Sequence, residues 1–429
     1  MPGPNRNSEL ALVIGFLAVI AAVPVTQTCL ELVRHERVQA VDVFRYEPTA
    51  KNLRQFEHTL QEKSWFQQTL RPPLQQLLFA TLRDTGAKGM LGRDQWLFYR
   101  PDVRYLVEPD RLETGPTDTR WVAPPSRLTH RQSVEQAIVR FRDQLKERGI
   151  GLVVMPVPGK PSIYPDQVTG REAGKAAELR SPTLRLIEAL ESQGVSVVNL
   201  FPAFQAARAG GGPLYLAHDT HWTPRGAELA AQIAAAQLRA LLLASPGQSA
   251  FQLRRVPVLR SGDILDMMQI PGLREKFPAE AVECVQVTDA ALGPMLPGAS
   301  ARPGTYCYPG QQATVLVLGD SFSRIYQYAE PQSLGELAAG ATNGVPVQTG
   351  TKRLLPGSAG FVSHLALQLR APVDAIVSDG GAATDVRRKL STDPEILEGK
   401  KVVVWEFVER DIALGAQGWE PVELPRKLQ

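Results

Sequence analysis

The feature that most constrains the fold of this chain is a series of short apolar runs separated by segments with helical spacing. Residues 151–157, 313–318 and 401–407 consist mostly of Val, Leu and other apolar residues. Near-continuous apolar strands are typical of a parallel sheet that helices cover on both faces. Successive parallel strands are joined by right-handed crossovers, usually through a helix. The sequence therefore predicts an α/β domain whose open parallel sheet is flanked by helices.

The rest of the alternation is less regular but follows the same order. We expect helices over 133–148, 181–193, 224–244 and 358–369, an aromatic strand at the end of 89–99, and strands over 195–200 and 375–377. Residues 252–311 do not fit the alternation and are rich in proline, which predicts a loop-rich insertion. In open parallel sheets ligands lie beyond the carboxyl ends of the strands, so functional residues are expected there.

Composition excludes some classes of function. The 429 residues are 44% hydrophobic and 21% charged, as in folded globular proteins, and the net charge of +3 is too small to indicate nucleic-acid binding. Cys29, Cys284 and Cys307 lack a metal-binding spacing, so neither a metal nor another cofactor is expected. Cys284 and Cys307 would form a disulfide in an oxidising compartment, and the alternative is two buried free thiols.

The N-terminal region predicts a membrane segment. Residues 10–28 carry no charge and are long enough to cross a hydrocarbon core of about 30 Å as a helix. We expect a signal-anchor with residues 1–9 as a short cytoplasmic tail, and a cleaved signal peptide is the alternative. Both place the rest of the chain outside the cytoplasm. Residues 29–85 are then a helical stalk or linker broken at Pro72 and Pro73, and residues 86–429 are the α/β domain.

Ser321 stands where a buried strand would deliver it to the edge of the sheet. Gly319 permits a tight exit from the strand because it has no Cβ, and Asp320 can brace the turn. A helix that starts after this turn would direct the N–H of Ser321 toward a developing oxyanion. Ser321 is therefore a candidate nucleophile, and the alternative is an ordinary turn that caps a helix.

A candidate base and its acid precede this serine in the chain. Asp219 and His221 are two residues apart, so in an extended segment their side chains share a face, although a direct contact requires a bend. Asp219 would accept a hydrogen bond from Nδ1 of the imidazole and leave Nε2 to take the proton from Ser321. The alternatives are a buried histidine bonded to backbone, and His218 as the base.

Four stretches of the chain together match a known pattern. They are the segment 92–99, the block Asp219-Thr220-His221-Trp222-Thr223-Pro224 followed by Gly226, the block Gly319-Asp320-Ser321-Phe322-Ser323, and Val403-Val404-Trp405-Glu406-Phe407 followed by Glu409-Arg410. On these residues the chain, over roughly 88–411, resembles the SGNH/GDSL hydrolase superfamily and, within it, the AlgX/AlgJ-like polysaccharide O-acetyltransferases. The acid–base pair precedes the serine, which reverses the order of ordinary SGNH enzymes and is typical of this branch. The resemblance implies an AlgJ-like layout, in which we expect a membrane segment, one catalytic domain and no C-terminal carbohydrate-binding module.

The resemblance implies an SGNH-like catalytic domain over 86–429 with Asp219, His221 and Ser321 as a triad. It implies an O-acetyltransferase that moves an acetyl group through an acetyl-serine onto hydroxyls of an exopolysaccharide such as alginate. The enzyme would be periplasmic and anchored to the inner membrane, with a multipass membrane O-acyltransferase as acetyl supplier and no nucleic-acid partner. A polysaccharide acetylesterase and a non-catalytic scaffold of a secretion complex are the alternatives.

Other candidate site residues belong to less specific patterns. The resemblance implies oxyanion donors besides the N–H of Ser321, for which Asn343 and Gly380 are candidates, with plain turns as the alternative. Tryptophan rings can stack on sugars and arginines can steer acidic sugars, although core packing and solvated surface are their commoner roles. On this basis the substrate-binding candidates are Trp222, Arg324, Arg353 and Trp405.

Overall fold

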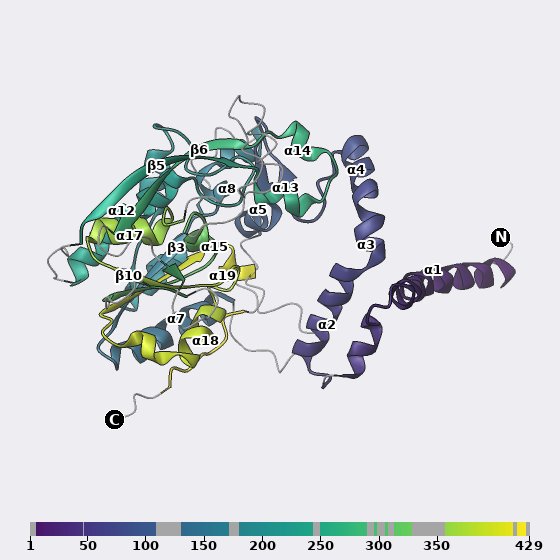
Figure 1. Ribbon diagram of the computed structural model, residues 1–429, viewed down its shortest axis with the longest axis horizontal. Helices are drawn as coiled ribbons and strands as arrows, with labels where there is room; N and C mark the ends of the chain where they lie inside the picture. Colours follow the sequence, from purple (N-terminus) through teal and green to yellow (C-terminus); the bar gives the residue numbers. More distant parts are fainter. Residues whose placement is uncertain are drawn as a thin grey trace. The chain divides into compact units, whose positions relative to one another are not determined.

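The computed structural model describes residues 6–45, 47–108, 130–170, 180–242, 249–289, 296–297, 305–307, 313–327, 357–414 and 418–425. The chain divides into two compact units, one formed mainly by residues before Gly86 and the other mainly by residues from Gly86 on. Figure 1 labels the elements of both units, which are described separately below.

The first unit begins with a long apolar helix. Helix α1 covers Arg6–Val33, and its 28 residues span about 42 Å at 1.5 Å per residue. Its segment Leu12–Val33 has a mean hydropathy of 2.1 and is long and apolar enough to cross a membrane. These properties fit a membrane anchor and a signal segment equally well.

Short helices complete the first unit. They are η1 (Gln39–Phe44), α2 (Ala50–Lys63), α3 (Trp65–Thr69) and α4 (Arg71–Leu82). Gln27 of α1 accepts a hydrogen bond from the N–H of Trp65 at 2.7 Å, which joins the first helix to the third. The break predicted at Pro72 and Pro73 lies at Leu70, between α3 and α4. The two prolines occupy the first turn of α4, where the missing N–H costs no hydrogen bond.

The second unit contains a seven-stranded sheet with the order β4-β3-β11-β9-β10-β8-β7. The five parallel strands are β3 (Gly151–Val157), β4 (Ser196–Val197), β9 (Val315–Gly319), β10 (Val373–Val377) and β11 (Val402–Val408). This confirms the predicted parallel sheet. Two short antiparallel strands, β7 (Leu296–Pro297) and β8 (Thr305–Cys307), extend one edge of the sheet and were not expected.

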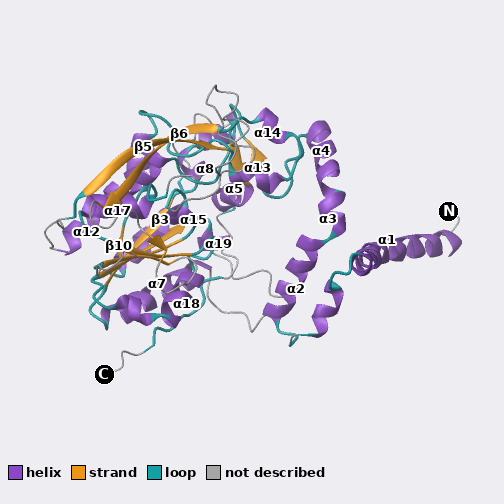
Figure 2. Ribbon diagram, viewed as in Figure 1, coloured by secondary structure: helices purple, strands orange, loops and turns teal. Residues whose placement is uncertain are grey.

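Alternate residues of the central strands face two separate cores. Along β3, Val153 and Met155 belong to one core, while Leu152 and Val154 belong to the other. The first core includes residues of α12 (Pro224–Leu242) and α17 (Phe361–Leu369), and the second includes residues of α7 (His130–Lys146), α10 (Thr183–Ser192) and α18 (Asp385–Thr392). Helices therefore cover both faces of the sheet, as Figure 2 shows, and this burial on both sides explains the continuous apolar runs.

The segment expected to be a loop-rich insertion contains a long antiparallel ribbon instead. Strands β5 (Phe251–Arg260) and β6 (Glu280–Asp289) pair over their full length, and they enclose α13 (Asp263–Met268) and α14 (Leu273–Lys276). Cys284 of β6 is buried as a free thiol, so the disulfide with Cys307 is not formed. Burial raises the pKa of the Cys284 thiol to about 12, which makes it unreactive at neutral pH.

Shorter elements connect the sheet to its surroundings. They are the hairpin β1 (Gly89–Leu91) and β2 (Leu97–Tyr99), followed by α5 (Arg100–Val107), α8 (Lys160–Ile163), α9 (Pro165–Val168), α11 (Phe201–Ala207), α15 (Ser321–Arg324), η3 (Pro394–Leu397) and α19 (Asp411–Leu414). Strands β3, β9, β10 and β11 all end at the same edge of the sheet, where α8, α15 and α19 begin nearby. This carboxyl edge holds the candidate site.

Candidate active site

Ser321 occupies a sharp turn between β9 and α15. The Asp320 carboxylate accepts hydrogen bonds from the N–H of Phe322 at 2.8 Å and from the N–H of Val408 at 2.9 Å. These bonds tie the turn to the end of β11. Ser321 is the first residue of α15, where α-helices leave N–H groups without intrahelical partners. Its N–H is therefore available to an oxyanion.

Glu406 lies directly beneath this turn. It is fully buried, and its Oε2 accepts hydrogen bonds from the hydroxyl of Ser323 at 2.6 Å and the N–H of Asp320 at 3.1 Å. Burial, aided by the charge of Asp320, raises the pKa of Glu406 well above its ordinary value, which favours the neutral form of its carboxyl. A Cβ at Gly319 would overlap both Ser323 and Glu406, which explains the glycine at the strand end.

Asp219 and His221 meet because the segment between them bends. Tyr215 and Trp222 form an isolated antiparallel bridge, and the loop that it closes carries both motif residues. The Asp219 Oδ1 atom lies 3.0 Å from the backbone N and 2.6 Å from the ring Nδ1 of His221. Asp219 is 0% exposed. The extended geometry of the sequence prediction is therefore replaced by a tight turn that brings carboxylate and imidazole into direct contact.

The electrostatics of this pair favour an ionised acid beside a basic imidazole. Burial alone would raise the pKa of Asp219, but the charge and hydrogen bonds of His221 outweigh it and lower that pKa strongly. Burial alone would lower the pKa of His221, but Asp219 outweighs it and raises that pKa. The Nε2 atom of His221 is buried and has no hydrogen-bond partner among the described residues.

The serine turn and the histidine loop meet through Phe322. Its ring centroid lies 4.9 Å from that of His221 and 5.1 Å from that of Trp222. Phe322 directly follows Ser321 in α15, so the two motifs, distant in the sequence, adjoin in the fold. No hydrogen bond between Ser321 and His221 is present within the described part of the chain.

Lys160 supports the histidine loop and was missed by the sequence analysis. It is 1% exposed, and its Nζ donates hydrogen bonds to the carbonyls of Leu216, Ala217 and Asp219 at 2.9, 3.0 and 2.7 Å. Burial lowers the pKa of Lys160 to about 8. Lys160 stands three residues after the end of the predicted strand 151–157, and this position at the strand end was the sequence feature that pointed to it.

The aromatic segment before α5 covers this lysine. Lys160 Nζ lies 5.5 Å from the ring centroid of Trp96 and 5.1 Å from that of Phe98. The segment 92–99, part of the family resemblance, thus covers the lysine, and its Leu97 N–H donates to the carbonyl of Ala217 at 2.8 Å.

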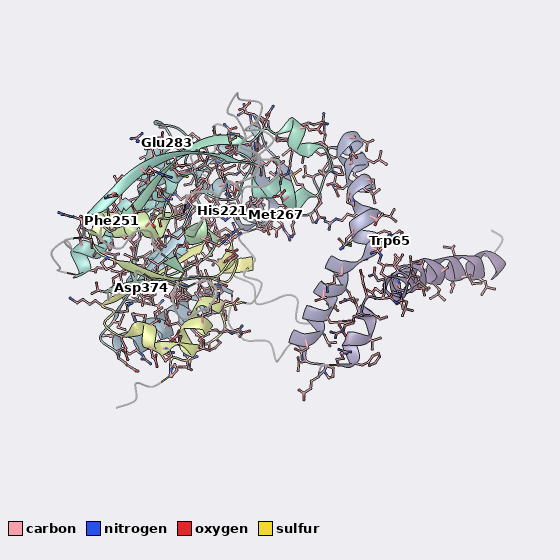
Figure 3. All side chains as sticks on the ribbon, viewed as in Figure 1. Trp65, His221, Phe251, Met267, Glu283 and Asp374 are labelled. Carbon is pink, nitrogen blue, oxygen red and sulfur yellow. The ribbon has the colours of Figure 1, made fainter. Side chains whose placement is uncertain are left out.

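Asp263, the first residue of α13, is a second carboxylate at the imidazole and was also missed. Its Oδ1 accepts a hydrogen bond from the N–H of Thr220 at 2.7 Å, and its Oδ2 accepts one from the Thr220 hydroxyl at 2.6 Å. The same Oδ2 lies 3.5 Å from Nδ1 of His221. Figure 3 labels His221 near Met267 of the same helix.

The three side chains Asp219, His221 and Asp263 have ligand atoms within 4.8 Å of one another, which is the spacing of a possible metal site. A cation would have to bind at Nδ1, which already faces Asp219 Oδ1 at 2.6 Å. That contact is a short charge-assisted hydrogen bond. The donor set therefore fits an acid–base pair, in which Nδ1 carries a proton, and does not fit a metal centre.

Arg410 brings positive charge to the same edge. It is paired with Asp102 at 3.0 Å, and its guanidinium lies 5.9 Å from the ring centroid of Phe322 and 5.2 Å from that of Tyr99. The neighbouring Asp411 has its pKa raised to about 7, first by burial, against the opposing effect of Arg410. In the sequence, Arg410 stands out only as part of a stretch that matches the family pattern.

The substrate-binding candidates lie in different settings. Trp222 and Trp405 are both 0% exposed, and Trp405 donates from Nε1 to the carbonyl of Ala382 at 2.8 Å. Neither ring offers a face to a sugar, because core packing occupies both, so their predicted stacking role is wrong. Arg324 is paired with Asp379 at 2.6 Å, beside the strand end. Gly380 follows Asp379 with φ of +61°, and Asn343 and Arg353 lie outside the described residues.

The chain is similar to several known proteins. The family described as SGNH hydrolase-like domain, acetyltransferase AlgX, matches residues 90–341. A probable alginate O-acetylase AlgJ of Pseudomonas syringae pv. tomato is 27% identical over 337 residues, which are 75% of this chain and 68% of that protein. A probable alginate O-acetylase AlgJ of Pseudomonas aeruginosa is 28% identical over 248 residues, 57% of each protein.

A solved structure shows the same fold. The O-acetyltransferase domain of Pseudomonas putida AlgJ superposes with a TM-score of 0.51 and 21% identity, covering 76% of this chain and 92% of that domain. The likeness extends the sequence match to the arrangement of the sheet and helices. Since the family match covers more than half of the residues, the chain belongs to the SGNH hydrolase-like, AlgX-type acetyltransferase family.

Proposed function

We propose that the chain is a polysaccharide O-acetyltransferase in which Ser321 carries the acetyl group and His221 is the general base. One observation carries the proposal: a buried imidazole has Nδ1 held by Asp219 at 2.6 Å and Nε2 without a partner among the described residues, beside the turn that presents Ser321. Serine acyl transfer requires this set of nucleophile, base and orienting acid. The family membership and the AlgJ relatives support the same reaction class.

The first half of the proposed reaction acylates the serine. Ser321 Oγ attacks the carbonyl carbon of an acetyl donor, and its proton moves to Nε2 of His221. The N–H of Ser321 stabilises the oxyanion; such a donor typically contributes about 3–4 kcal/mol to the transition state. The donor group then leaves with the proton from Nε2, which restores the neutral imidazole and leaves an ester bond between the acetyl group and Oγ.

The second half transfers the acetyl group to a sugar. A hydroxyl of the polysaccharide loses its proton to Nε2 of His221 and attacks the acetyl-serine carbonyl. The ester bond to Oγ breaks, and Oγ regains the proton from the imidazolium. Asp219 stabilises the imidazolium in both halves because its ionised carboxylate faces Nδ1. General-base assistance of this kind typically accelerates a reaction about 10²–10⁴-fold.

The acceptor and the location are part of the proposal. The relatives act on alginate according to their names, so an exopolysaccharide rich in uronic acids is the proposed acceptor. Helix α1 is the proposed inner-membrane anchor of a periplasmic domain, followed by a helical stalk up to residue 85 and the catalytic domain from residue 86. A multipass membrane O-acyltransferase is the proposed acetyl supplier.

The proposal is tested with the purified full chain in detergent. We would supply p-nitrophenyl acetate as donor and mannuronate oligomers as acceptor, and measure acetylated oligomer and free acetate by mass spectrometry. Wild type should acetylate the oligomer, whereas Ser321→Ala should lose at least about 10³-fold in rate and keep its folding transition. Ser192→Ala, an exposed serine of α10, is the matched control and should act like wild type.

Other outcomes identify the alternatives. Free acetate without acetylated oligomer would indicate an acetylesterase with the same catalytic residues. Acetylation that survives Ser321→Ala at the wild-type rate would remove the serine from the mechanism. Full polysaccharide acetylation in cells carrying Ser321→Ala, but not in cells lacking α1, would indicate a scaffold.

A further inference from the structure

We propose that Asp263 is a second carboxylate partner of the His221 imidazole, a positioning residue that holds Thr220 and approaches Nδ1 directly. The inference rests on the proposed function, because it assigns His221 the role of base. It differs from the triad in that two carboxylates, one from each of two chain segments, approach the same ring nitrogen.

The contacts around Thr220 support this role. Both oxygens of Asp263 accept hydrogen bonds from Thr220, one from its N–H at 2.7 Å and one from its hydroxyl at 2.6 Å. That hydroxyl also lies 3.1 Å from Nδ1 of His221. Thr220 stands between Asp219 and His221, so Asp263 fixes the residue on which the bend of the acid–base pair depends.

The connection runs in both directions. The N–H of Asp263 donates to Oδ2 of Asp219 at 3.2 Å, so each carboxylate receives a backbone N–H from the segment of the other. A Cβ at Gly262 would overlap the carbonyl of His218, which shows how closely the start of α13 approaches the histidine loop. The α13 segment and the histidine loop therefore form one hydrogen-bonded unit.

An acidic residue at a helix start often serves only to cap that helix. Here the hydrogen bonds described for the Asp263 oxygens come from Thr220 and not from N–H groups of α13. The direct approach of Oδ2 to Nδ1, at 3.5 Å, also lies outside any capping geometry. Asp263 is thus oriented toward the imidazole and does not cap its own helix through these bonds.

The charges around the ring explain what a second carboxylate adds. The titratable and charged groups that act on Asp263 or His221 are Asp219, Lys160, Arg410 and Tyr99. Arg260 acts on Asp219, and Glu280 acts on Lys160. Two carboxylates at Nδ1 stabilise the imidazolium that forms in each half of the reaction more than Asp219 alone would. Arg410 acts in the opposite direction and lowers the pKa of His221.

Asp263 can also lose this effect within the accessible pH range. Burial, followed by the charge of Asp219, raises the pKa of Asp263 to about 6. Its side chain is 30% exposed, so protons from solvent reach it. Below about pH 6 the second negative charge disappears while Asp219 stays ionised, because the pKa of Asp219 is strongly lowered.

The test is a comparison of Asp263→Asn with Asp266→Asn in the full chain. Asp266 lies on the same helix and is exposed, so its substitution removes the same charge away from the ring. The pKa of His221 would be followed by NMR of protein labelled with ¹⁵N-histidine, and kcat would be measured against pH. Thermal unfolding would check that each variant folds.

We expect Asp263→Asn to lower the pKa of His221, to move the acidic limb of the kcat profile to lower pH, and to reduce the plateau kcat by about 10–100-fold. Asp266→Asn should change none of these. An unchanged pKa of His221 in a folded Asp263→Asn protein would overturn the inference, as would an equal shift in Asp266→Asn. If Asp263→Asn does not fold, Thr220→Val replaces it as the test. We expect Thr220→Val to lower the pKa of His221 and to reduce kcat by a smaller factor. An unchanged pKa of His221 in that variant would overturn the inference.

The NMR measurement also separates this inference from the proposed function. The pKa of His221 can be followed in a protein that transfers no acetyl group. A lowered pKa in Asp263→Asn without any acetyl transfer would support the role of Asp263 and contradict the proposed reaction. Acetyl transfer by the wild type, together with an unchanged pKa of His221 in Asp263→Asn, would support the proposed reaction and contradict the role of Asp263.

Discussion

The Nδ1 atom of His221 lies 2.6 Å from Oδ1 of Asp219, and the Nε2 atom on the other side of the ring is buried with no partner in the part of the chain that the structure describes. The two residues are only two positions apart, so this contact exists because the loop closed by Tyr215 and Trp222 bends sharply. One nitrogen is thereby fixed as the proton-bearing one, and the other is left free to accept a proton.

The pH dependence of the reaction should follow His221. The imidazole acts as a base only when neutral, and Asp219 raises its pKa, so kcat should be low at acid pH and rise with pH through that raised value. Asp219→Asn removes the charge that raises it. We expect the rise to move to lower pH and the plateau to fall about 10²–10⁴-fold, as stopped assays across pH would measure. A profile unchanged by Asp219→Asn would contradict the assignment of acid and base.

Glu406 should tolerate replacement by a neutral isostere. Burial and the charge of Asp320 raise the pKa of Glu406 and favour its neutral carboxyl, so Glu406→Gln should preserve the shape and the charge of that form. Glu406→Ala instead leaves the hydroxyl of Ser323 and the N–H of Asp320 without their buried acceptor, at about 1–3 kcal/mol for each group. Urea unfolding and kcat should be near wild type for Gln and clearly reduced for Ala. Equal damage in both variants would show that Glu406 carries a required negative charge.

Lys160→Met should destabilise the protein by about 3 kcal/mol or more. The substitution leaves three buried carbonyls without a donor, and each costs about 1–3 kcal/mol.

Burial lowers the pKa of Lys160 from 10.5 to about 8, so between these pH values the unfolded chain binds more protons than the folded chain. The free energy of unfolding of wild type should therefore gain a contribution that rises with pH from about 8 to 10.5. Chemical denaturation at several pH values should show this rise in wild type and not in Lys160→Met; equal slopes in the two proteins would contradict the buried-lysine account.

Trp405 should contribute to stability and not to sugar binding. Its ring contacts Phe141, Phe407 and Trp419 within the core. Trp405→Ala should cost about 3–5 kcal/mol of unfolding free energy, with KM for the oligosaccharide unchanged in the folded fraction. A large rise in KM without loss of stability would restore the stacking role that the sequence suggested.

The sheet could be predicted because burial on both faces leaves a plain mark in the sequence. Strand β3 begins and ends at the predicted residues, and β9, β10 and β11 lie within two residues of their expected bounds. The β5–β6 ribbon was missed because β5 is largely exposed and β6 is mostly half-buried, so neither has the continuous apolar run of a central strand. The short edge strands β7 and β8 carry too few residues for any periodicity.

Candidate site residues could be predicted only where they stand in short sequence blocks. Ser321, His221 and Asp219 stand in short blocks whose order carries information. Lys160 and Asp263 reach the same loop from separate segments, and Asp263 lies 43 residues from Thr220 along the chain. No spacing rule connects such residues, because the fold brings them together. Trp222 and Trp405 show the opposite error. Both stand in motif blocks and were expected to contact sugar at the surface, but both rings lie in the core.

The most direct test of the central claim is to detect the acetyl-serine itself. The full chain would be mixed with p-nitrophenyl acetate, quenched in acid within the first turnover and digested for peptide mass spectrometry. We predict one acetyl group on Ser321 in wild type, none at that position in Ser321→Ala, and a strongly reduced yield in His221→Ala. An unmodified Ser321 during active transfer, or transfer at the wild-type rate by Ser321→Ala, would contradict the account.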